Sequence, residues 1–286
     1  MLVTITAILL FIGEIFPFTL YFSEEPTERV TILSLQGNNP FIFGYDEGYF
    51  RKSVYSYKNS LEEGLIKNPE TDIVVIPESS NFLRALSFFE GKPESVLVKE
   101  LLGEEKERLL IYGDYDRDEN VSIVQIISNE GEVHSLYKDL LMPLGEYQPY
   151  LIEFFAKIFN QKEWLSQVHS VRQIKNVSNA EKLVGSHFGK ITALECSEIL
   201  SPKIYRKIKK EKPDIIFHLQ RLASFHGDLR IFQYMLAASK VRAAELRTPI
   251  VGSIDGSGYS YVIDMFGVVQ EIGTENTKFI SAEISI

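Results

Sequence analysis

The sequence predicts a mixed α/β domain, and two patterns support that prediction. In the first, a short apolar run at 29–36 precedes residues 46–68, whose apolar side chains recur at helical spacing, and another apolar run follows at 72–76. An alternation of strand, helix and strand is typical of α/β layers. In the second, three β-rich runs between residues 108 and 137 are separated by short polar turns, which predicts consecutive antiparallel strands.

The C-terminal half continues the alternation of strands and helices. Further strands are predicted from the apolar runs at 190–195, 214–219, 249–254 and 259–264. A basic helix is expected directly after Ser201, which suits an N-cap, and Pro202 suits the first helical position. A longer helix is expected at 228–246. No repeat or low-complexity linker interrupts the pattern, so we predict one domain over residues 27–286.

Residues 1–22 differ from the rest because they are nearly all apolar, interrupted by Glu14 and Pro17. A helix that spans a membrane needs roughly 20 such residues. The segment lacks the positive start and the small-residue cleavage site of a signal peptide. We therefore predict a membrane helix, with a buried N-terminal strand or helix as the alternative. The acidic flank that follows favours the non-cytoplasmic side for the domain.

Composition excludes several classes of function. The 286 residues carry a net charge of −9, whereas proteins that bind nucleic acid usually have a basic balance. The single cysteine, Cys196, cannot form an intramolecular disulfide. The five histidines show no HExxH or paired-ligand spacing, so we expect no metal site. No phosphate-binding loop with its lysine is present, so we expect no nucleotide cofactor.

Three polar residues, Glu78, Lys138 and Cys196, each follow a predicted strand, where α/β proteins commonly place their ligand sites. A free thiol is mostly protonated at neutral pH, so a nucleophilic Cys196 needs a base such as the Glu78 carboxylate. The ammonium of Lys138 can stabilise both a thiolate and an oxyanion. Taken singly, each residue also has an ordinary interpretation, as a core filler or a solvated loop charge.

The stretches around these residues resemble the carbon–nitrogen hydrolase (nitrilase) superfamily, whose catalytic residues occur in the order Glu, Lys, Cys. Within it, the chain resembles the apolipoprotein N-acyltransferase family from about residue 29 to 270. The similar stretches are "VTILSLQGNNP", "DIVVIPESS", "LYKDLLMPLGEYQP", "ECSEILSP", "SKVRAAELRTPIV" and "GYSYVID". The third is the most specific, because it is similar to the family pattern Leu-x-Pro-x-Gly-Glu-Tyr-x-Pro after a Tyr-(x)-Lys.

The resemblance implies a nitrilase-like four-layer α-β-β-α sandwich and a role in lipoprotein biosynthesis. Glu78 would be the general base, Lys138 the oxyanion cation, and Cys196 the nucleophile that takes a fatty acyl chain from a phospholipid as a thioester. The acceptor would be the N-terminal amine of a diacylglyceryl-lipoprotein, with the domain on the extracytoplasmic side of the cell membrane. Two further family glutamates fall on Glu146, expected to pair with Lys138, and on Glu198, expected to tune the same network.

The chain departs from the family in three places. It has one apolar segment before the domain and none after it, where the family has several before and one after. Residues 220–227 read QRLASFHG in place of the family's Asn-Asp-Ala-Trp-Phe, and Ser197 stands where an aromatic residue is usual. Two alternatives stay open. One is a nitrilase-type amidase that hydrolyses a small amide with the same triad, and the other is a degenerate, non-catalytic relative that binds lipid or a lipoprotein.

Overall fold

A computed structural model describes residues 28–39, 47–78, 80–116, 119–141, 181–225 and 228–286, with residues 158, 174, 175 and 177. The apolar segment 1–22 and Glu146 lie outside the described residues. Among the helices that are described, none is both long enough and apolar enough to cross a membrane.

The described strands and helices agree with the sequence pattern. The strands are β1 (Arg29–Gly37), β2 (Ile73–Val75), β3 (Leu109–Asp116), β4 (Val121–Ser128), β5 (Val133–Tyr137), β6 (Val184–Ser186), β7 (Gly189–Glu195), β8 (Ile215–Arg221), β9 (Ile250–Asp255), β10 (Tyr261–Ile263), β11 (Val269–Ile272) and β12 (Phe279–Ser285). The helices are α2 (Glu47–Lys67), α3 (Phe82–Glu90), α4 (Glu94–Leu102), α7 (Pro202–Glu211) and α8 (Leu229–Leu246), with the short 3₁₀ helices η2 (Cys196–Leu200) and η3 (Ala223–Phe225). Within the described residues, every run that was predicted from the sequence as a strand or helix is found close to its expected bounds.

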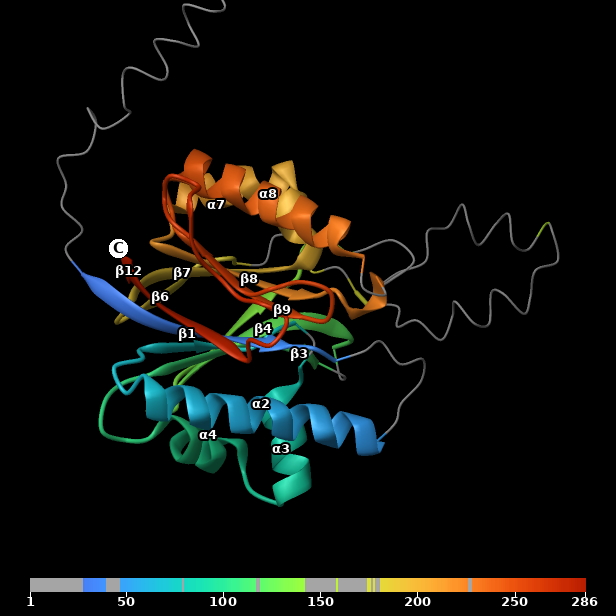
Figure 1. Cartoon of the computed structure of the whole chain (residues 1–286), viewed down its shortest axis with the longest axis vertical. Coiled ribbons are helices and arrows are strands. Elements are labelled where there is room, and N and C mark those ends of the chain that lie inside the picture. Colours follow the sequence, from blue (N-terminus) through green and yellow to red (C-terminus); the bar gives the residue numbers. More distant parts are fainter. Residues whose placement is uncertain are drawn as a thin grey trace, which may run out of the picture.

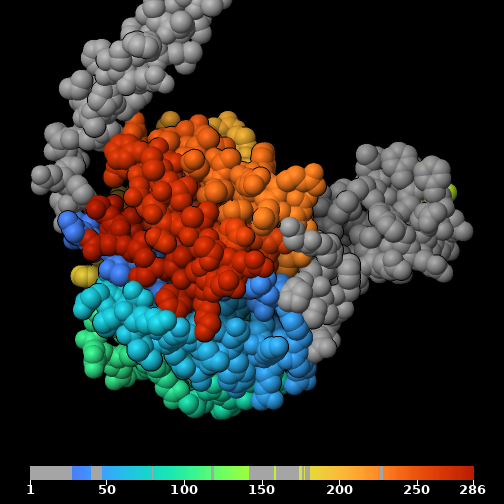
Figure 2. All heavy atoms as spheres, in the orientation of Figure 1, coloured from blue at the N-terminus to red at the C-terminus, as the bar shows by residue number. Residues whose placement is uncertain are grey.

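Strand β1 joins two half-sheets. The strand order is β5-β4-β3-β2-β1-β9-β8-β7-β6, with β12 beside β1 and β10 beside β9 and β11. The first part of β1 pairs with β2 and β12, whereas Gln36 and Gly37 at its end pair with β9. Strand β12, near the C-terminus, therefore packs against β1, and Figure 2 shows red residues in contact with blue ones.

Three hydrophobic clusters separate four layers. One cluster lies between the half-sheets and includes Ile111 from the first and Phe217 from the second. Another packs the first half-sheet against α2, α3 and α4, and the third packs the second half-sheet against α7 and α8. Figure 1 shows the same order, with α2–α4 on one side of the strands and α7 and α8 on the other. The predicted four-layer α-β-β-α sandwich is confirmed.

Period-two patterning explains why the short strand β2 fits between two layers. Ile73 and Val75 face the cluster between the half-sheets, whereas Val74 and Ile76 face the helices. Successive side chains of a strand point to opposite faces, so a strand covered on both sides reads as a continuous apolar run. The sequence "DIVVI" has this character, and it ends at the loop that carries Glu78.

Local signals at helix ends were also read correctly. The Ser201 hydroxyl accepts the backbone N–H of Ile204 at 3.3 Å, and Pro202 occupies the first turn of α7. The Asp228 carboxylate accepts the N–H of Arg230 at 2.9 Å and caps α8. Each cap satisfies a backbone donor that lacks an intrahelical partner. Ser201 is the single residue between η2 and α7. Its cap therefore fixes where η2, which begins at Cys196, ends.

Candidate active site

Glu78, Lys138 and Cys196 follow strands that run in one direction. β2 is parallel to β1 and β3, and β7, β8 and β9 are mutually parallel. β1 is also parallel to β9. β5 is antiparallel to β4, which is antiparallel to β3, so β5 runs the same way as β3. The carboxyl ends of β2, β5 and β7 therefore lie at one edge of the sandwich, where α/β proteins commonly bind ligands.

Two of the three predicted triad residues are in direct contact. The Lys138 ammonium Nζ lies 2.7 Å from Glu78 Oε1, and the two side chains are only 1% and 6% exposed. The backbone N–H of Lys138 donates to the carbonyl of Ser122 at 3.0 Å, and the N–H of Arg221 donates to Glu78 Oε2 at 3.2 Å. A base and a cation thus stand side by side, as nucleophile activation and oxyanion stabilisation require.

Cys196 lies at a strained turn directly after β7. Its backbone is left-handed, with φ of 47°. This conformation costs a non-glycine residue on the order of 1–3 kcal/mol, and it is found disproportionately at functional sites. Lys212 and Arg247 also have positive φ, but they cap the ends of α7 and α8. The side chain of Cys196 is buried and contacts the cluster beneath α7 and α8.

The turn at Cys196 is within electrostatic range of the Glu78–Lys138 pair. Glu195, the residue before Cys196, experiences the charges of both Lys138 and Glu78. His218, which is hydrogen-bonded to Cys196, also experiences the charge of Lys138. The structure therefore brings the three predicted triad residues to one end of the sandwich.

His218 on β8 ties the Cys196 turn to the interior, and sequence reasoning missed it. Its Nε2 lies 2.8 Å from the backbone oxygen of Cys196, and a carbonyl only accepts, so Nε2 carries the proton. Nδ1 is then an acceptor for the Tyr261 hydroxyl at 2.8 Å, with Ser239 Oγ at 3.1 Å. Burial lowers the pKa of His218 to about 4, so the imidazole is neutral at pH 7.

A glycine makes room for the ring that supports His218. An added Cβ on Gly252 in β9 would lie 2.4 Å from the Tyr261 ring, closer than real Cβ contacts come. The absence of a side chain lets Tyr261 cross β9 and reach His218. The sequence holds a signal for this contact, because a glycine inside a strand, here within 249–254, often marks the close approach of another group.

Glu198 lies two residues after Cys196, and it pairs with a lysine that sequence reasoning missed. Lys182 Nζ lies 2.8 and 3.0 Å from the two Glu198 oxygens and 2.5 Å from the backbone oxygen of Tyr137. Both side chains of this ion pair are 1% exposed. Lys182 is thus the ion-pair partner of Glu198 that the structure shows, and the expected tuning of the Glu78–Lys138 network by Glu198 stays a prediction.

The Glu198 carboxylate also holds two loops together. It accepts the backbone N–H of Asp139 at 2.7 Å and that of Glu195 at 3.0 Å. Asp139 follows Lys138, and Glu195 precedes Cys196. The carboxylate therefore fixes the spacing between the lysine segment and the nucleophile segment, which is a positioning role through backbone contacts.

A third buried glutamate, Glu195, was not singled out from the sequence. It is 1% exposed, and its Oε2 accepts the hydroxyl of Ser122 on β4 at 2.9 Å. Ser122 belongs to the opposite half-sheet, so this bond spans the space between the sheets. Burial raises the pKa of Glu195 to about 8, and the negative charges of Glu78 and Glu198 act in the same direction while Lys138 opposes them.

Part of the stretch that departs from the family pattern at 220–227 contacts Glu78 and the support of His218. Its residues 220–225 are described, whereas 226 and 227 lie outside the described residues. Arg221 supplies the N–H to Glu78, and Gln220 Nε2 donates to the Tyr261 hydroxyl at 3.1 Å. The altered stretch therefore contributes directly to the geometry of the site. Nearby, and throughout the described residues, no group of three His, Cys, Asp or Glu side chains is arranged to hold a metal ion.

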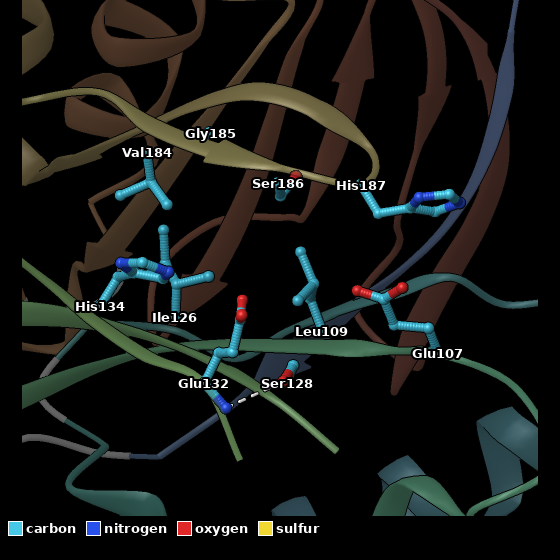
Figure 3. Close-up of a pocket in the computed structure, with 10 residues that line it drawn as sticks. All are labelled: Glu107, Leu109, Ile126, Ser128, Glu132, His134, Val184, Gly185, Ser186 and His187. Atoms are coloured by element: carbon cyan, nitrogen blue, oxygen red, sulfur yellow. Dashed lines mark hydrogen bonds between the residues drawn. The ribbon is translucent and has the colours of Figure 1, made fainter. Parts of the chain in front are cut away.

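A small cavity lies at the opposite end of the strands. It has a volume of about 20 Å³, roughly enough for one water molecule. It is lined by Leu109 at the start of β3, Ser128 at the end of β4, strand β6 and His187 of the turn that follows it (Figure 3). β7 runs from this end toward Glu195, so the cavity is not part of the candidate active site.

Comparison with known proteins gives a match at the level of structure alone. No protein-family model and no curated protein matches the sequence. A carbon–nitrogen hydrolase from Helicobacter pylori matches with a TM-score of 0.64 at 15% identity, over 91% of this chain and 90% of that one. Nit3 of Saccharomyces cerevisiae, a nitrilase-superfamily member, matches with a TM-score of 0.61 at 14% identity, over 92% of each chain.

The fold is that of the nitrilase superfamily. An amidase of that superfamily from Nesterenkonia also matches, with a TM-score of 0.59 at 10% identity over 93% of each chain. At such identities the likeness concerns the arrangement of strands and helices. Which residues act, and on what substrate, must be argued from the site of this chain.

Proposed function

We propose that this nitrilase-fold chain is an acyl-transfer enzyme in which Cys196 carries the acyl group as a thioester. The observation that supports this best is the buried Glu78–Lys138 ion pair at the strand ends, within range of the left-handed turn at Cys196. A base, a cation and a thiol at one sheet edge are the groups that covalent acyl transfer needs. No cofactor is required for such chemistry.

In the first half-reaction, Cys196 attacks the carbonyl carbon of the acyl donor. Glu78 takes the proton of the thiol, and Lys138 stabilises the negative charge that develops on the carbonyl oxygen. The bond between the carbonyl carbon and the leaving group then breaks. Glu78 returns the proton to the leaving group, which departs as an alcohol or an amine, and the acyl group remains on sulfur.

In the second half-reaction, an acceptor attacks the thioester. Glu78 takes one proton from the acceptor, the bond between carbon and sulfur breaks, and the proton passes to the Cys196 sulfur. An amine acceptor gives an amide, whereas water gives a carboxylic acid. The same residues thus serve a transferase or a hydrolase, and the acceptor decides between them.

The substrates that we propose are a phospholipid donor and the N-terminal amine of a diacylglyceryl-lipoprotein. The support comes from the sequence, namely the apolar segment 1–22 and the pattern around Glu146, and both lie outside the described residues. On this proposal the chain is held at the cell membrane with its domain on the extracytoplasmic side. Glu146 would contact Lys138 from the segment that follows it.

Hydrolysis of a small amide is the second candidate. One solved structure with the same fold is described as an amidase, and another as a carbon–nitrogen hydrolase. Residues 220–225 also differ from the acyltransferase pattern at the position that contacts Glu78. Here an amine leaves in the first half-reaction and water is the acceptor in the second.

One experiment separates these functions. The protein is incubated with a phospholipid that carries a radiolabelled acyl chain, and the label on the protein is measured before and after neutral hydroxylamine, which cleaves thioesters. Because Cys196 is the single cysteine, a labelled thioester can form at no other residue. We expect hydroxylamine-sensitive labelling, and its transfer to a synthetic diacylglyceryl peptide with a free amine.

The variant Cys196→Ser is the control. It replaces the thiol with a hydroxyl of similar size, and any oxygen ester that it forms resists neutral hydroxylamine. Sensitive labelling that persists in this variant would rule out the mechanism. Labelled thioester that is released only as free fatty acid, even with the amine present, would favour the hydrolase.

A further inference from the structure

Charge balance in the dry interior beside the triad leaves one carboxyl without a cation. Three glutamates and two lysines lie there with at most 6% of their surface exposed: Glu78, Glu195, Glu198, Lys138 and Lys182. Lys138 pairs with Glu78, and Lys182 pairs with Glu198. Among the described residues, Glu195 forms no ion pair. An isolated carboxylate in such a place is strongly unfavourable, and a buried acid normally avoids it by keeping its proton.

The hydrogen bonds of Glu195 agree with a protonated acid. Oε2 accepts from the Ser122 hydroxyl, and the side chain also faces the backbone N–H of Glu198 in a capping box, whereas Oε1 is buried without a partner among the described residues. If Glu195 were ionised, Oε1 would carry about half of the negative charge and would have no hydrogen-bond donor among its described neighbours to stabilise it. In a neutral acid the carbonyl oxygen accepts from Ser122 and the other oxygen carries the proton, which reduces the penalty.

We infer that Glu195 is a positioning residue that stays neutral while the site works, so that it does not compete with Glu78 for the Lys138 ammonium. If Glu195 ionises, a second carboxylate competes for Lys138, and a negative charge appears one residue from the nucleophile. Both effects make the thiolate of Cys196 harder to form. The inference rests on the proposed function, because it concerns the same base, cation and thiol.

The groups that face Glu195 set the direction of this effect. The carboxylates of Glu78 and Glu198 oppose its ionisation, and Lys138 favours it. Lys182 is already engaged by Glu198 on the far side, and His218 on the neighbouring strand is neutral. Burial and two carboxylates therefore outweigh one lysine, and the pKa of Glu195 lies near 8, just above neutral pH.

The single cysteine allows a direct test in the full chain. The rate at which iodoacetamide alkylates Cys196 is measured from about pH 6 to about pH 10, since the thiolate is the reactive form. When two neighbouring groups ionise in the same range, each opposes the other and the curve broadens beyond a one-proton titration. We expect a broad curve for the parent protein. Glu195→Gln, which mimics the neutral acid, should give a one-proton curve with its midpoint at lower pH.

Two matched variants sharpen the test. Glu132→Gln removes an exposed carboxylate at the opposite end of the strands and should reproduce the parent curve. Ser122→Ala removes the bond to Oε2, which lowers the pKa of Glu195, so the broadening should move to higher pH. Superimposable curves for the parent and Glu195→Gln would overturn the inference.

A second measurement decides the question if Glu195→Gln does not fold. The infrared carbonyl band of a buried, protonated carboxylic acid should be present in the parent protein at neutral pH and disappear above about pH 8. Its absence at neutral pH would overturn the inference. A protein that shows this band but forms no acyl thioester would retain the inference about Glu195 and lose the proposed function, so the two failures are distinguishable.

Discussion

Two buried glutamate–lysine pairs lie near Cys196, and they differ in what surrounds them. Lys138 and Glu78 both follow strand ends, and the pair bridges two loops at the edge of the first half-sheet. Lys182 and Glu198 lie beneath the nucleophile turn, and together they contact the backbone of Tyr137, Asp139 and Glu195. On the proposed function the first pair offers charges to a reacting group, whereas the second connects segments of the chain.

The comparison shows that a buried ion pair is not by itself a sign of catalysis or of stability. Removing two charges from water is expensive, and the attraction between them only roughly repays that penalty. The partners distinguish the roles, since backbone donors indicate a structural connection and proximity to a nucleophile indicates chemistry. Loss of one partner should therefore affect activity at Glu78 and folding at Lys182.

The largest effect is expected for Glu78→Gln. The amide has the same size and can still accept the N–H of Arg221, but it cannot take a proton from Cys196. We expect the single-turnover rate of thioester formation, followed by mass spectrometry, to fall by about 10²- to 10⁴-fold. Glu70→Gln, an exposed position before β2, should act at the parent rate. Parent-like acylation by Glu78→Gln would remove Glu78 from the role of base.

At the second pair, Lys182→Met should destabilise the fold. It leaves the Glu198 carboxylate buried without its cation, which typically costs about 3–5 kcal/mol. Urea unfolding followed by circular dichroism measures this loss. Lys278→Met is the matched control, because Lys278 lies 2.8 Å from Glu63 and the two side chains are 63% and 37% exposed. Exposed pairs contribute about 0–1 kcal/mol, so equal losses in the two variants would contradict the assignment.

Much of the fold was predictable because its signals are local. The runs at 29–36, 72–76 and 190–195 are continuous and apolar, and they became β1, β2 and β7. Strand β12 was missed, since apolar and polar residues alternate only weakly in its sequence "FISAEIS". Its pairing partner β1 is also far away in sequence. Strand β6, with three residues, is too short for any periodicity to identify it.

The site was predictable only in part, for a related reason. Glu78, Lys138 and Cys196 were found through a resemblance in the stretches around them. Lys182 and Glu195 carry no such pattern, and their importance comes from burial and from partners on other strands. No window of sequence shows that five ionisable side chains lie close together in the buried interior. The role of Glu146 stays a prediction, because it lies outside the described residues.

Glu195 links stability to pH, and it offers a smaller test of the same comparison. Its pKa is about 8 in the folded state against an ordinary value of 4.5. Between these values the folded state holds a proton that the unfolded state has released, so the unfolding free energy falls as pH rises, by up to about 1.4 kcal/mol per unit. The stability that the protonated Glu195 contributes is present in full below its ordinary pKa of 4.5. It is lost as pH rises through the folded-state pKa of about 8. Glu195→Gln should show a flatter dependence in urea unfolding, and parallel curves would contradict a neutral Glu195.

The smallest effect is expected at His218, where position and chemistry can be separated by two substitutions. His218→Leu leaves the Cys196 carbonyl and the Tyr261 hydroxyl without this partner, at about 1–3 kcal/mol for a buried unsatisfied group. His218→Gln can still place an N–H near the Cys196 carbonyl. If the bond positions the nucleophile turn, the Gln variant should acylate faster than the Leu variant by about tenfold for each 1.4 kcal/mol of positioning energy. The rates are compared at equal fractions of folded protein, so a loss of stability alone does not separate the two. Equal rates would mean that His218 supports the fold and leaves the geometry of Cys196 unchanged.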